Sequence, residues 1–152
     1  MLRLGYNTSA FAHSNNMTYI IGILHDLGYD GMELTLDRRH FHPHFTDGDA
    51  RRQLARHVAA HKLEVVLSVG GRYVLSDVAH EPSLVSVNAA ERQRFVDFAE
   101  ETIRLAPAVG ARTIMLHSGT LLPGADSAEA WQWLVAEVAY LAAVAQSCGV
   151  RL

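Results

Sequence analysis

The chain has 152 residues, which is enough for one domain with a sizeable hydrophobic core. Hydrophobic residues make up 49% of the sequence and charged residues 19%, as in an ordinary globular protein. The formal net charge of -3 offers no basic field to a polyanion, so a nucleic-acid partner is not favoured.

Short apolar runs alternate with helix-like stretches along the whole chain. Four complete runs and the beginning of a fifth have the composition of β-strands; they cover residues 2–8, 31–37, 63–71, 112–119 and 149–152. Strands that alternate with helical segments are typical of βα units, which assemble into a parallel sheet. The sequence therefore predicts an α/β fold and resembles the first half of a larger βα protein.

The first two helices are predicted between these strands. Asn15 or Asn16 is a good N-cap for the first helix, and Gly28 is a suitable stop. The second helix is predicted over residues 49–62, where apolar residues recur at helical spacing. We expect the apolar faces of both helices to cover the sheet.

The third and fourth helices have stronger start signals. Asn88 with Glu91, and Asp126 with Glu129, match the capping-box pattern. Pro107 should kink or end the third helix. The predicted apolar stripe of the fourth helix consists of Trp131, Leu134, Val135, Val138, Leu141, Ala142 and Ala145. Such a stripe indicates core packing rather than a cofactor site.

The cysteine content and the longest apolar stretch bear on location. Cys148 is the single cysteine, so an intramolecular disulfide is excluded and a reducing compartment is favoured. The N-terminal sequence lacks the apolar region of a signal peptide. The stretch VAEVAYLAAVAQ contains Glu137 and is too short to span a bilayer. We expect a cytoplasmic protein without a membrane partner.

His117 is the strongest candidate for a functional residue. Ligands of parallel βα proteins bind at the C-terminal ends of the strands, and His117 directly follows the strand sequence TIML. A neutral imidazole there could bind a divalent metal or hydrogen-bond a substrate oxygen. The alternative is a hydrogen-bonded core histidine without a ligand.

Glu33 lies inside the predicted strand GMELTLD. A carboxylate is rarely buried without a partner. If Glu33 faces the interior of a barrel, it binds a polar ligand or pairs with an arginine, for which Arg72 and Arg3 are candidates. If it faces the helices, it forms a structural ion pair.

Two histidine patterns suggest metal sites at first sight. The sequence HFHPH places His40, His42 and His44 at alternate positions. Pro43 and the adjacent arginines predict a loop, however, and no set of ligands at tetrahedral-site spacing accompanies them, so one histidine contributing to a pocket is the better interpretation. A second pattern, His57 and His61, lacks the glutamate of HExxH and predicts a solvated helix face.

The connection over residues 72–87 is too long for an ordinary βα loop and is therefore a candidate for function. Gly70 and Gly71 precede it and Arg72 is its first residue. The glycines could let the backbone approach an anionic group while the Arg72 guanidinium supplies donors. The alternative is a tight turn with a surface arginine. The pattern matches neither GxGxxG nor the P-loop, so it indicates no nucleotide site.

Several phrases together resemble a known family. LGYDGMELTLD, GGRYVLSD, HEPSLVS and VGARTIMLHSG are similar to sequences of the sugar phosphate isomerase/epimerase group of xylose isomerase-like TIM barrels. The resemblance runs from the first strand to the start of the fifth. It implies the first half of a (β/α)8 TIM barrel, with residues 1–152 forming a single partial domain.

The resemblance also implies a chemistry. Family members move a proton between adjacent carbons of a sugar or sugar phosphate, using a divalent metal and carboxylates. The metal ligands and catalytic residues of the family are expected after Leu152. The positions carried over here are substrate-binding ones: Glu33, Arg72, His80 and His117, with His117 also a candidate metal ligand.

A half-barrel would have unpaired sheet edges, so we expect it to need its missing C-terminal half, a second copy or another partner, and to be inactive alone.

Two other functions remain open: a metal-dependent phosphodiesterase resembling endonuclease IV, and a non-catalytic barrel that serves binding or assembly. A flavodoxin-like domain is a further alternative, but it would need a complete fifth strand and helix.

Overall fold

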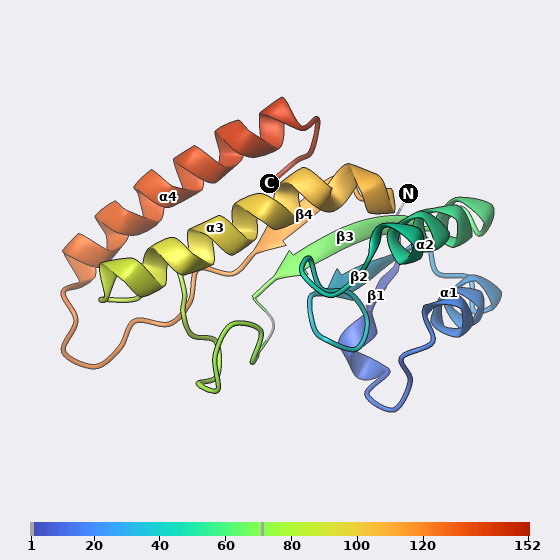
Figure 1. Ribbon diagram of the computed structural model, residues 1–152, viewed down its shortest axis with the longest axis horizontal. Helices are drawn as coiled ribbons and strands as arrows, with labels where there is room; N and C mark the ends of the chain where they lie inside the picture. The colour runs from blue at the N-terminus through green and yellow to red at the C-terminus, as the bar shows by residue number, and fades with distance from the viewer. Residues whose placement is uncertain (1, 71) are drawn as a thin grey trace.

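A parallel four-stranded sheet lies at the centre of the protein (Figure 1). The computed structural model describes residues 2–70 and 72–152. The strands are β1 (Gly5–Asn7), β2 (Gly31–Thr35), β3 (Glu64–Val69) and β4 (Thr113–Leu116), and they pair in chain order. This order confirms the predicted βα units, and it differs from the flavodoxin order, in which the first strand lies between the second and the third.

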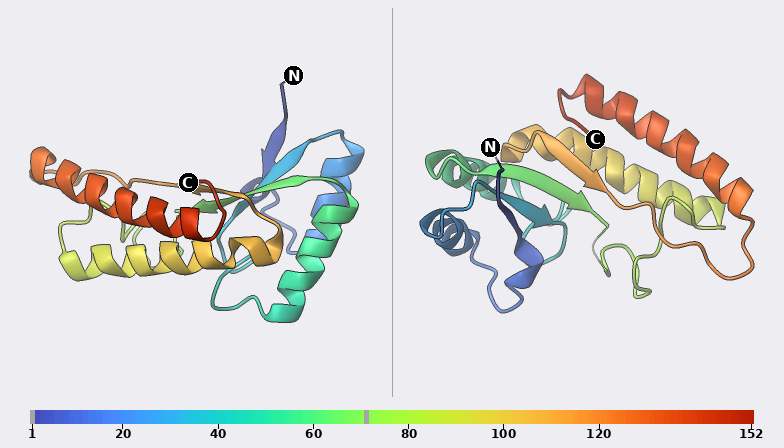
Figure 2. Two further views of the ribbon diagram at one scale, coloured as in Figure 1. Left: turned by 90° about the horizontal axis from the view of Figure 1, so that it is seen from above. Right: turned by 180° about the vertical axis from the view of Figure 1, so that it is seen from behind.

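The helices occupy one side of the sheet, and its other face carries no helix of the described residues (Figure 2). They are α1 (Met17–Asp26), α2 (Gly48–Ala60), α3 (Ala89–Leu105) and α4 (Ser127–Ser147), with short 3-10 helices η1 (Thr8–Ala10) and η2 (Ala106–Val109). After α4, Arg151 forms a parallel bridge with Thr113, which places the predicted fifth strand beside β4. None of the helices in the described ranges has the length and apolarity to cross a bilayer.

The helix N-termini are capped as the sequence predicts. Asn16 accepts a hydrogen bond from the Tyr19 amide, and Asn88 accepts from the amides at the start of α3. The reciprocal half of the capping box differs, because the Glu91 carboxylate pairs with Arg94 instead of the Asn88 amide. Pro107 ends α3 as expected, since the chain continues from Leu105 into η2.

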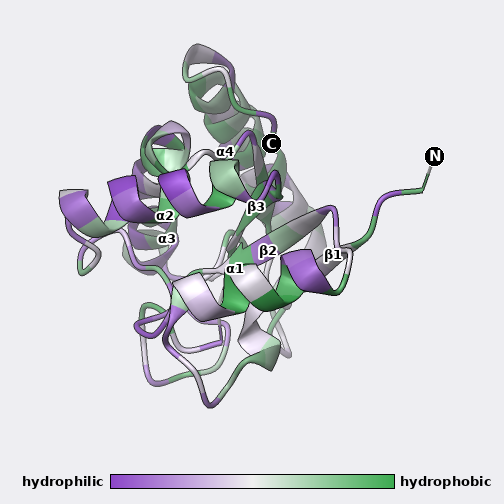
Figure 3. Ribbon diagram, turned by 90° about the vertical axis from the view of Figure 1, so that its right-hand side faces the viewer, coloured by the Kyte–Doolittle hydropathy of each residue, from purple (hydrophilic) through white to green (hydrophobic). Residues whose placement is uncertain are grey.

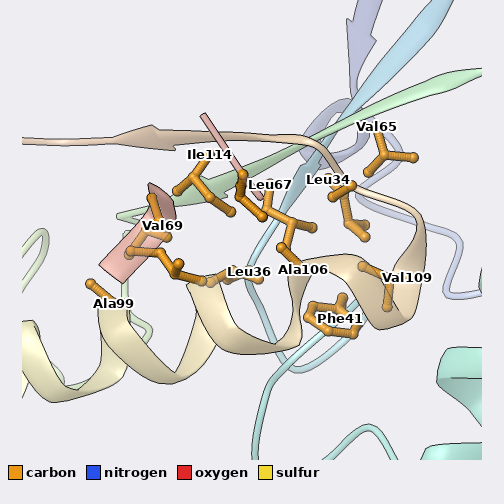
Figure 4. Packing of buried hydrophobic residues seen from close by; sticks show 14 of the residues in the cluster. Leu34, Leu36, Phe41, Val65, Leu67, Val69, Ala99, Ala106, Val109 and Ile114 are labelled. Carbon is orange, nitrogen blue, oxygen red and sulfur yellow. The ribbon is translucent and has the colours of Figure 1, made fainter. Parts of the chain in front are cut away.

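The core lies between the sheet and the helices (Figure 4). Leu67, Val69 and Ile114 point from β3 and β4 toward Ala99 and Ala106 of the α3–η2 segment, and all are buried. Alternate strand residues therefore face the helices, as the period of a β-strand requires. Each fully buried aliphatic side chain stabilises the fold by about 1.5–3 kcal/mol.

The predicted stripe of α4 is only partly buried. Leu141 and Ala145 are buried, but Trp131 and Val135 are 64% and 50% exposed. The reason is that α4 packs mainly against α3, whose Glu100 accepts a hydrogen bond from Tyr140. The helix therefore buries one flank, and the rest of the predicted stripe faces outward.

The N-terminal segment projects from the body of the protein (Figures 2 and 3). Leu2 is 87% exposed, and β1 begins at Gly5 rather than at the predicted residue 2. Along α2, hydrophilic and hydrophobic residues alternate in bands (Figure 3), consistent with the burial of only Leu54 and Val58 on that helix.

Candidate functional site

Polar side chains line the face of the sheet that carries no helix. Glu33 and Thr35 alternate with buried residues along β2, and Asn7 and Ser68 share their face because they pair in register with Glu33 and Thr35, respectively. Thr35 pairs in register with Ser68, and its hydroxyl donates a hydrogen bond to Asn7 Oδ1 at 2.9 Å. The C-terminal half of β1, β2 and β3 thus presents a row of hydrogen-bonding groups.

His117 extends this row beyond the end of β4. Its Nε2 lies 3.3 Å from Ser68 Oγ, and its amide donates to the Val69 carbonyl at 3.1 Å. The imidazole packs directly on Gly70, where an added Cβ would lie 2.7 Å from the Cβ of His117. The ring is therefore held by one hydroxyl and by the backbone of β3, while its outer part stays exposed.

Glu33 lies deeper on the same face. It aligns with Val66, which aligns with Thr113, so Glu33 is four residues below His117 in the register. At a rise of about 3.3 Å per residue, the two side chains are separated by roughly 13 Å along the strands. Glu33 lines a concavity of about 360 Å³. The structure thus places both residues on one face without bringing them into contact.

The expected arginine partner of Glu33 is not observed. Arg3 pairs with Glu64 at 2.6 Å, and Arg72 lies over the Tyr73 ring, 5.4 Å from its centroid. No side chain in residues 2–70 and 72–152 donates a hydrogen bond to Glu33. Neither Arg3 nor Arg72, the two candidates, pairs with Glu33 in the described residues, and the other alternative, that Glu33 binds a polar ligand, stays a prediction.

The long loop after β3 is held at both ends by α3. Arg94 donates to the Leu75 carbonyl, and Arg92 donates to the Ser86 carbonyl at 2.7 Å. Within the loop, the Ser86 hydroxyl donates to Glu81 at 2.5 Å. The loop also abuts the segment after β4, because a Cβ on Gly119 would lie 2.2 Å from Ser83 Oγ. These contacts fix the loop beside the end of β4.

Arg72 and His80 both lie in this loop, and both are exposed. The His80 amide donates to the Arg72 carbonyl at 2.7 Å, so the two residues close a turn. Neither side chain forms a hydrogen bond with Glu33 or His117. The predicted phosphate-binding turn includes Gly71, which lies outside the described residues.

The buried imidazole of His40 connects the loop after β1 to the loop after β2, at the carboxyl end of the sheet. His40 Nδ1 lies 3.0 Å from Asp37 Oδ2, and His40 Nε2 lies 3.0 Å from the Ser14 carbonyl oxygen. Both partners only accept, so both ring nitrogens donate and the ring is an imidazolium. The hydrogen bond to Asp37 raises the pKa of His40 above its usual value. Burial by itself raises the pKa of Asp37, but the hydrogen bonds from His40 outweigh it, so that this pKa is lowered.

This pair predicts a pH window of stability. The contribution of His40 to the free energy of unfolding is complete below the usual histidine pKa of 6.5, and it is lost as the pH rises through the raised pKa of His40. The Asp37 contribution is complete above 3.8 and is lost as pH falls through its lowered pKa. Replacing His40 with alanine should lower the free energy of unfolding at pH 6 by about 2 kcal/mol. The free energy of unfolding of this variant should also decrease less between pH 6 and pH 8 than that of the parent. Urea denaturation at each pH measures both effects. His13→Ala, at an exposed histidine, is the control; an unchanged pH profile for His40→Ala would contradict the assignment.

The other two histidines of HFHPH lie in a separate cluster. Burial lowers the pKa of His42, whose Nδ1 accepts a hydrogen bond from the His44 amide at 3.1 Å. His44 pairs with Glu101 at 2.6 Å. His42 and His44 line a cleft of about 570 Å³ with Phe98, which supports the prediction of a pocket contribution from this segment.

The residues do not fit the divalent metal that the resemblance implies. Within residues 2–70 and 72–152, no three histidine, cysteine or carboxylate side chains are placed to hold a metal ion together. His117 has Ser68 as its neighbour rather than a second chelating group. At the carboxyl end of the sheet, the described residues therefore supply at most His117 as an isolated ligand, and no chemical step is assigned to a metal.

Sequence reasoning emphasised Glu33 and His117 but gave no role to Thr35 and treated Ser68 only as a polar strand-end residue. The period of two was the available signal: Thr35 follows Glu33 by two positions and must share its face. The pairing of Ser68 with His117 depends on the register between β3 and β4, which a single sequence does not specify.

Parallel βα units in chain order, with polar residues gathered at the carboxyl ends of the strands, define the first half of a (β/α)8 barrel. The family model described as xylose isomerase-like TIM barrel matches residues 21–152. The chain belongs to this family. A search among curated proteins finds no match.

Solved structures agree on the fold. The structure of D-psicose 3-epimerase in the presence of D-fructose has a TM-score of 0.73 at 18% identity and covers 98% of this chain and 50% of its own. The structure of L-ribulose 3-epimerase has a TM-score of 0.71 at 24% identity, and the match covers 99% of this chain and 48% of that protein. The structure of AP endonuclease, family 2, from Brucella melitensis has a TM-score of 0.69 at 19% identity, and the match covers 99% of this chain and 53% of that protein. The chain spans about half the length of these proteins.

Proposed function

We propose that this chain forms the substrate-binding first half of a sugar or sugar phosphate isomerase or epimerase that moves a proton between adjacent carbons. The observation that carries the proposal is the polar row on the open face of the sheet, which ends at His117. A polyol needs several hydrogen-bonding groups on one wall; Glu33, Thr35 and His117 supply them, and the buried Ser68 holds His117. The family membership and the epimerase folds support the same proposal.

Each residue has a separate part in this proposal. The Glu33 carboxylate accepts hydrogen bonds from sugar hydroxyls in the concavity that it lines. His117, held by Ser68, contacts a substrate oxygen at the mouth of the barrel. Arg72 and His80, in the fixed loop, contact the exposed end of the substrate, where a phosphate would meet the guanidinium. We assign no proton-moving role to these four residues, and we expect the 152-residue chain alone to be inactive.

Replacing His117 with alanine should reduce kcat/KM about 10- to 100-fold, the effect of removing one hydrogen-bonding group from a polar substrate site. The measurement is turnover of a ketose panel by the natural gene product, before and after addition of Mn²⁺, Co²⁺ or Mg²⁺ to EDTA-treated protein. His13→Ala should retain full activity. Absence of turnover with every sugar and metal, or equal activity of the two variants, would overturn the proposal.

A substitution of Arg72 tests whether the substrate is a phosphorylated or a free sugar. If the substrate carries a phosphate, Arg72→Ala should raise KM for the phosphorylated sugar and leave KM for a free sugar unchanged. The same preparations should be tested on duplex DNA with an abasic site, because one similar structure is an AP endonuclease. The net charge of -3 disfavours DNA cleavage. DNA cleavage without sugar turnover would identify the phosphodiesterase instead.

A further inference from the structure

Histidines gather where α1 and α2 end, beside the amino ends of β2 and β3. His25 lies in the last turn of α1, His57 in the last turn of α2, and His61 is the C-cap of α2. The ring centroids of His25 and His61 are 5.2 Å apart, and those of His57 and His61 are 6.5 Å apart. This cluster is at the opposite end of the sheet from His117. It is therefore separate from the proposed sugar site.

Hydrogen bonds determine which nitrogen of two of these rings carries the proton. His25 Nδ1 lies 3.1 Å from the carbonyl oxygen of His61, and His61 Nδ1 lies 2.8 Å from the carbonyl oxygen of His57. A carbonyl oxygen only accepts, so Nδ1 is the donor in both rings. Each neutral ring then keeps a lone pair on Nε2. Metal-binding histidines are held in the same way, with the second ring nitrogen donating to a carbonyl or carboxylate.

The spacing of His25 and His61 also fits coordination of one ion. With metal–nitrogen bonds of about 2.0–2.1 Å in a tetrahedral site, the centroids of two bound imidazoles lie roughly 5 Å apart. The separation of 5.2 Å between His25 and His61 meets this requirement. His57 stands farther away, in agreement with the absence of a three-ligand group in the described ranges.

We propose that His25 and His61 form a two-histidine site for a divalent transition-metal ion, with water completing its coordination. Imidazole nitrogen suits Zn²⁺, Ni²⁺ and Cu²⁺, whereas Mg²⁺ and Ca²⁺ prefer oxygen ligands. His25 is exposed and His61 is half-buried, so neither residue is enclosed in the core. The bound ion joins α1 to α2 and stabilises the folded state. This site is independent of the proposed isomerase activity.

The test uses the natural gene product after EDTA treatment, with Ni²⁺ as the probe in titration calorimetry and thermal unfolding. The parent should bind one equivalent more Ni²⁺ than His25→Phe, a variant that keeps a ring but has no nitrogen. Saturating Ni²⁺ should raise the melting temperature of the parent by more than that of His25→Phe. His13→Phe, at an exposed histidine of another loop, should behave like the parent.

His61→Gln provides a second variant and should lose the same equivalent of Ni²⁺. Long-range ¹H–¹⁵N correlation spectra should show Nδ1–H tautomers for His25 and His61 in the metal-free protein, and Zn²⁺ should shift both Nε2 signals. Unchanged Ni²⁺ stoichiometry and affinity in both variants would overturn the proposal. Nε2–H tautomers in the metal-free protein would also overturn it.

Discussion

Replacing Gly70 with alanine is expected to lower kcat/KM of the natural gene product about as far as His117→Ala does, because the contact proposed between His117 and the substrate is lost. Gly70 has φ of +134°, a conformation that only glycine adopts readily, so the substitution costs about 1–3 kcal/mol in backbone strain. In addition, the new Cβ would lie 2.7–2.8 Å from the Cβ, Cγ and Cδ2 atoms of His117. The imidazole must then leave its position beside Ser68.

Gly124→Ala is the matched control for this substitution. Gly124 also has a positive φ, +84°, but no atom lies within 4 Å of an added Cβ. The Gly124→Ala substitution should therefore destabilise the fold through backbone strain alone and leave kcat/KM unchanged. The measurements are urea denaturation and turnover for both variants. Equal activity of Gly70→Ala and Gly124→Ala would show that the position of His117 does not matter for catalysis.

Replacing Leu67 with alanine should lower the free energy of unfolding by about 3 kcal/mol, within the range for fully buried leucines. Leu67 is 0% exposed and packs between β3 and the α3–η2 segment (Figure 4). Truncation removes its contacts and leaves a cavity that the surrounding side chains cannot fill.

Leu27→Ala is the control, because Leu27 is 70% exposed at the end of α1. It should change the free energy of unfolding by less than about 0.5 kcal/mol. Chemical denaturation at constant pH measures both values. Comparable losses in the two variants would mean that the packing between β3 and the α3–η2 segment is not the source of stability.

The βα organisation was predictable from sequence because local signals and hydrophobic pattern agree. Asn16, Asn88 and Asp126 cap the helices that they were predicted to begin, and each strand lies within its predicted run. The stripe of α4 was harder to predict. Trp131 and Val135 fit its helical spacing, but their exposure depends on how α4 sits against α3, which is a tertiary property.

The site was predictable in its parts rather than in its contacts. The strand pattern identified Glu33 and His117 as candidates, and the structure places both on the face of the sheet that carries no helix of the described residues, but their role in binding stays a prediction. It did not indicate that Arg3 pairs with Glu64. It also did not indicate that the imidazole of His40 bridges Asp37 and Ser14. Such pairings join separate loops and depend on register and loop conformation, which residue type and spacing do not determine.

The order of the strands has a consequence for how this chain folds during synthesis. Each strand pairs with the one made immediately before it, so every new βα unit can dock on an edge that has already left the ribosome. Closing contacts between neighbours in sequence costs less chain entropy than pairing distant segments. We therefore expect the sheet to grow from β1 toward β4 as translation proceeds, with each edge protected by the next strand.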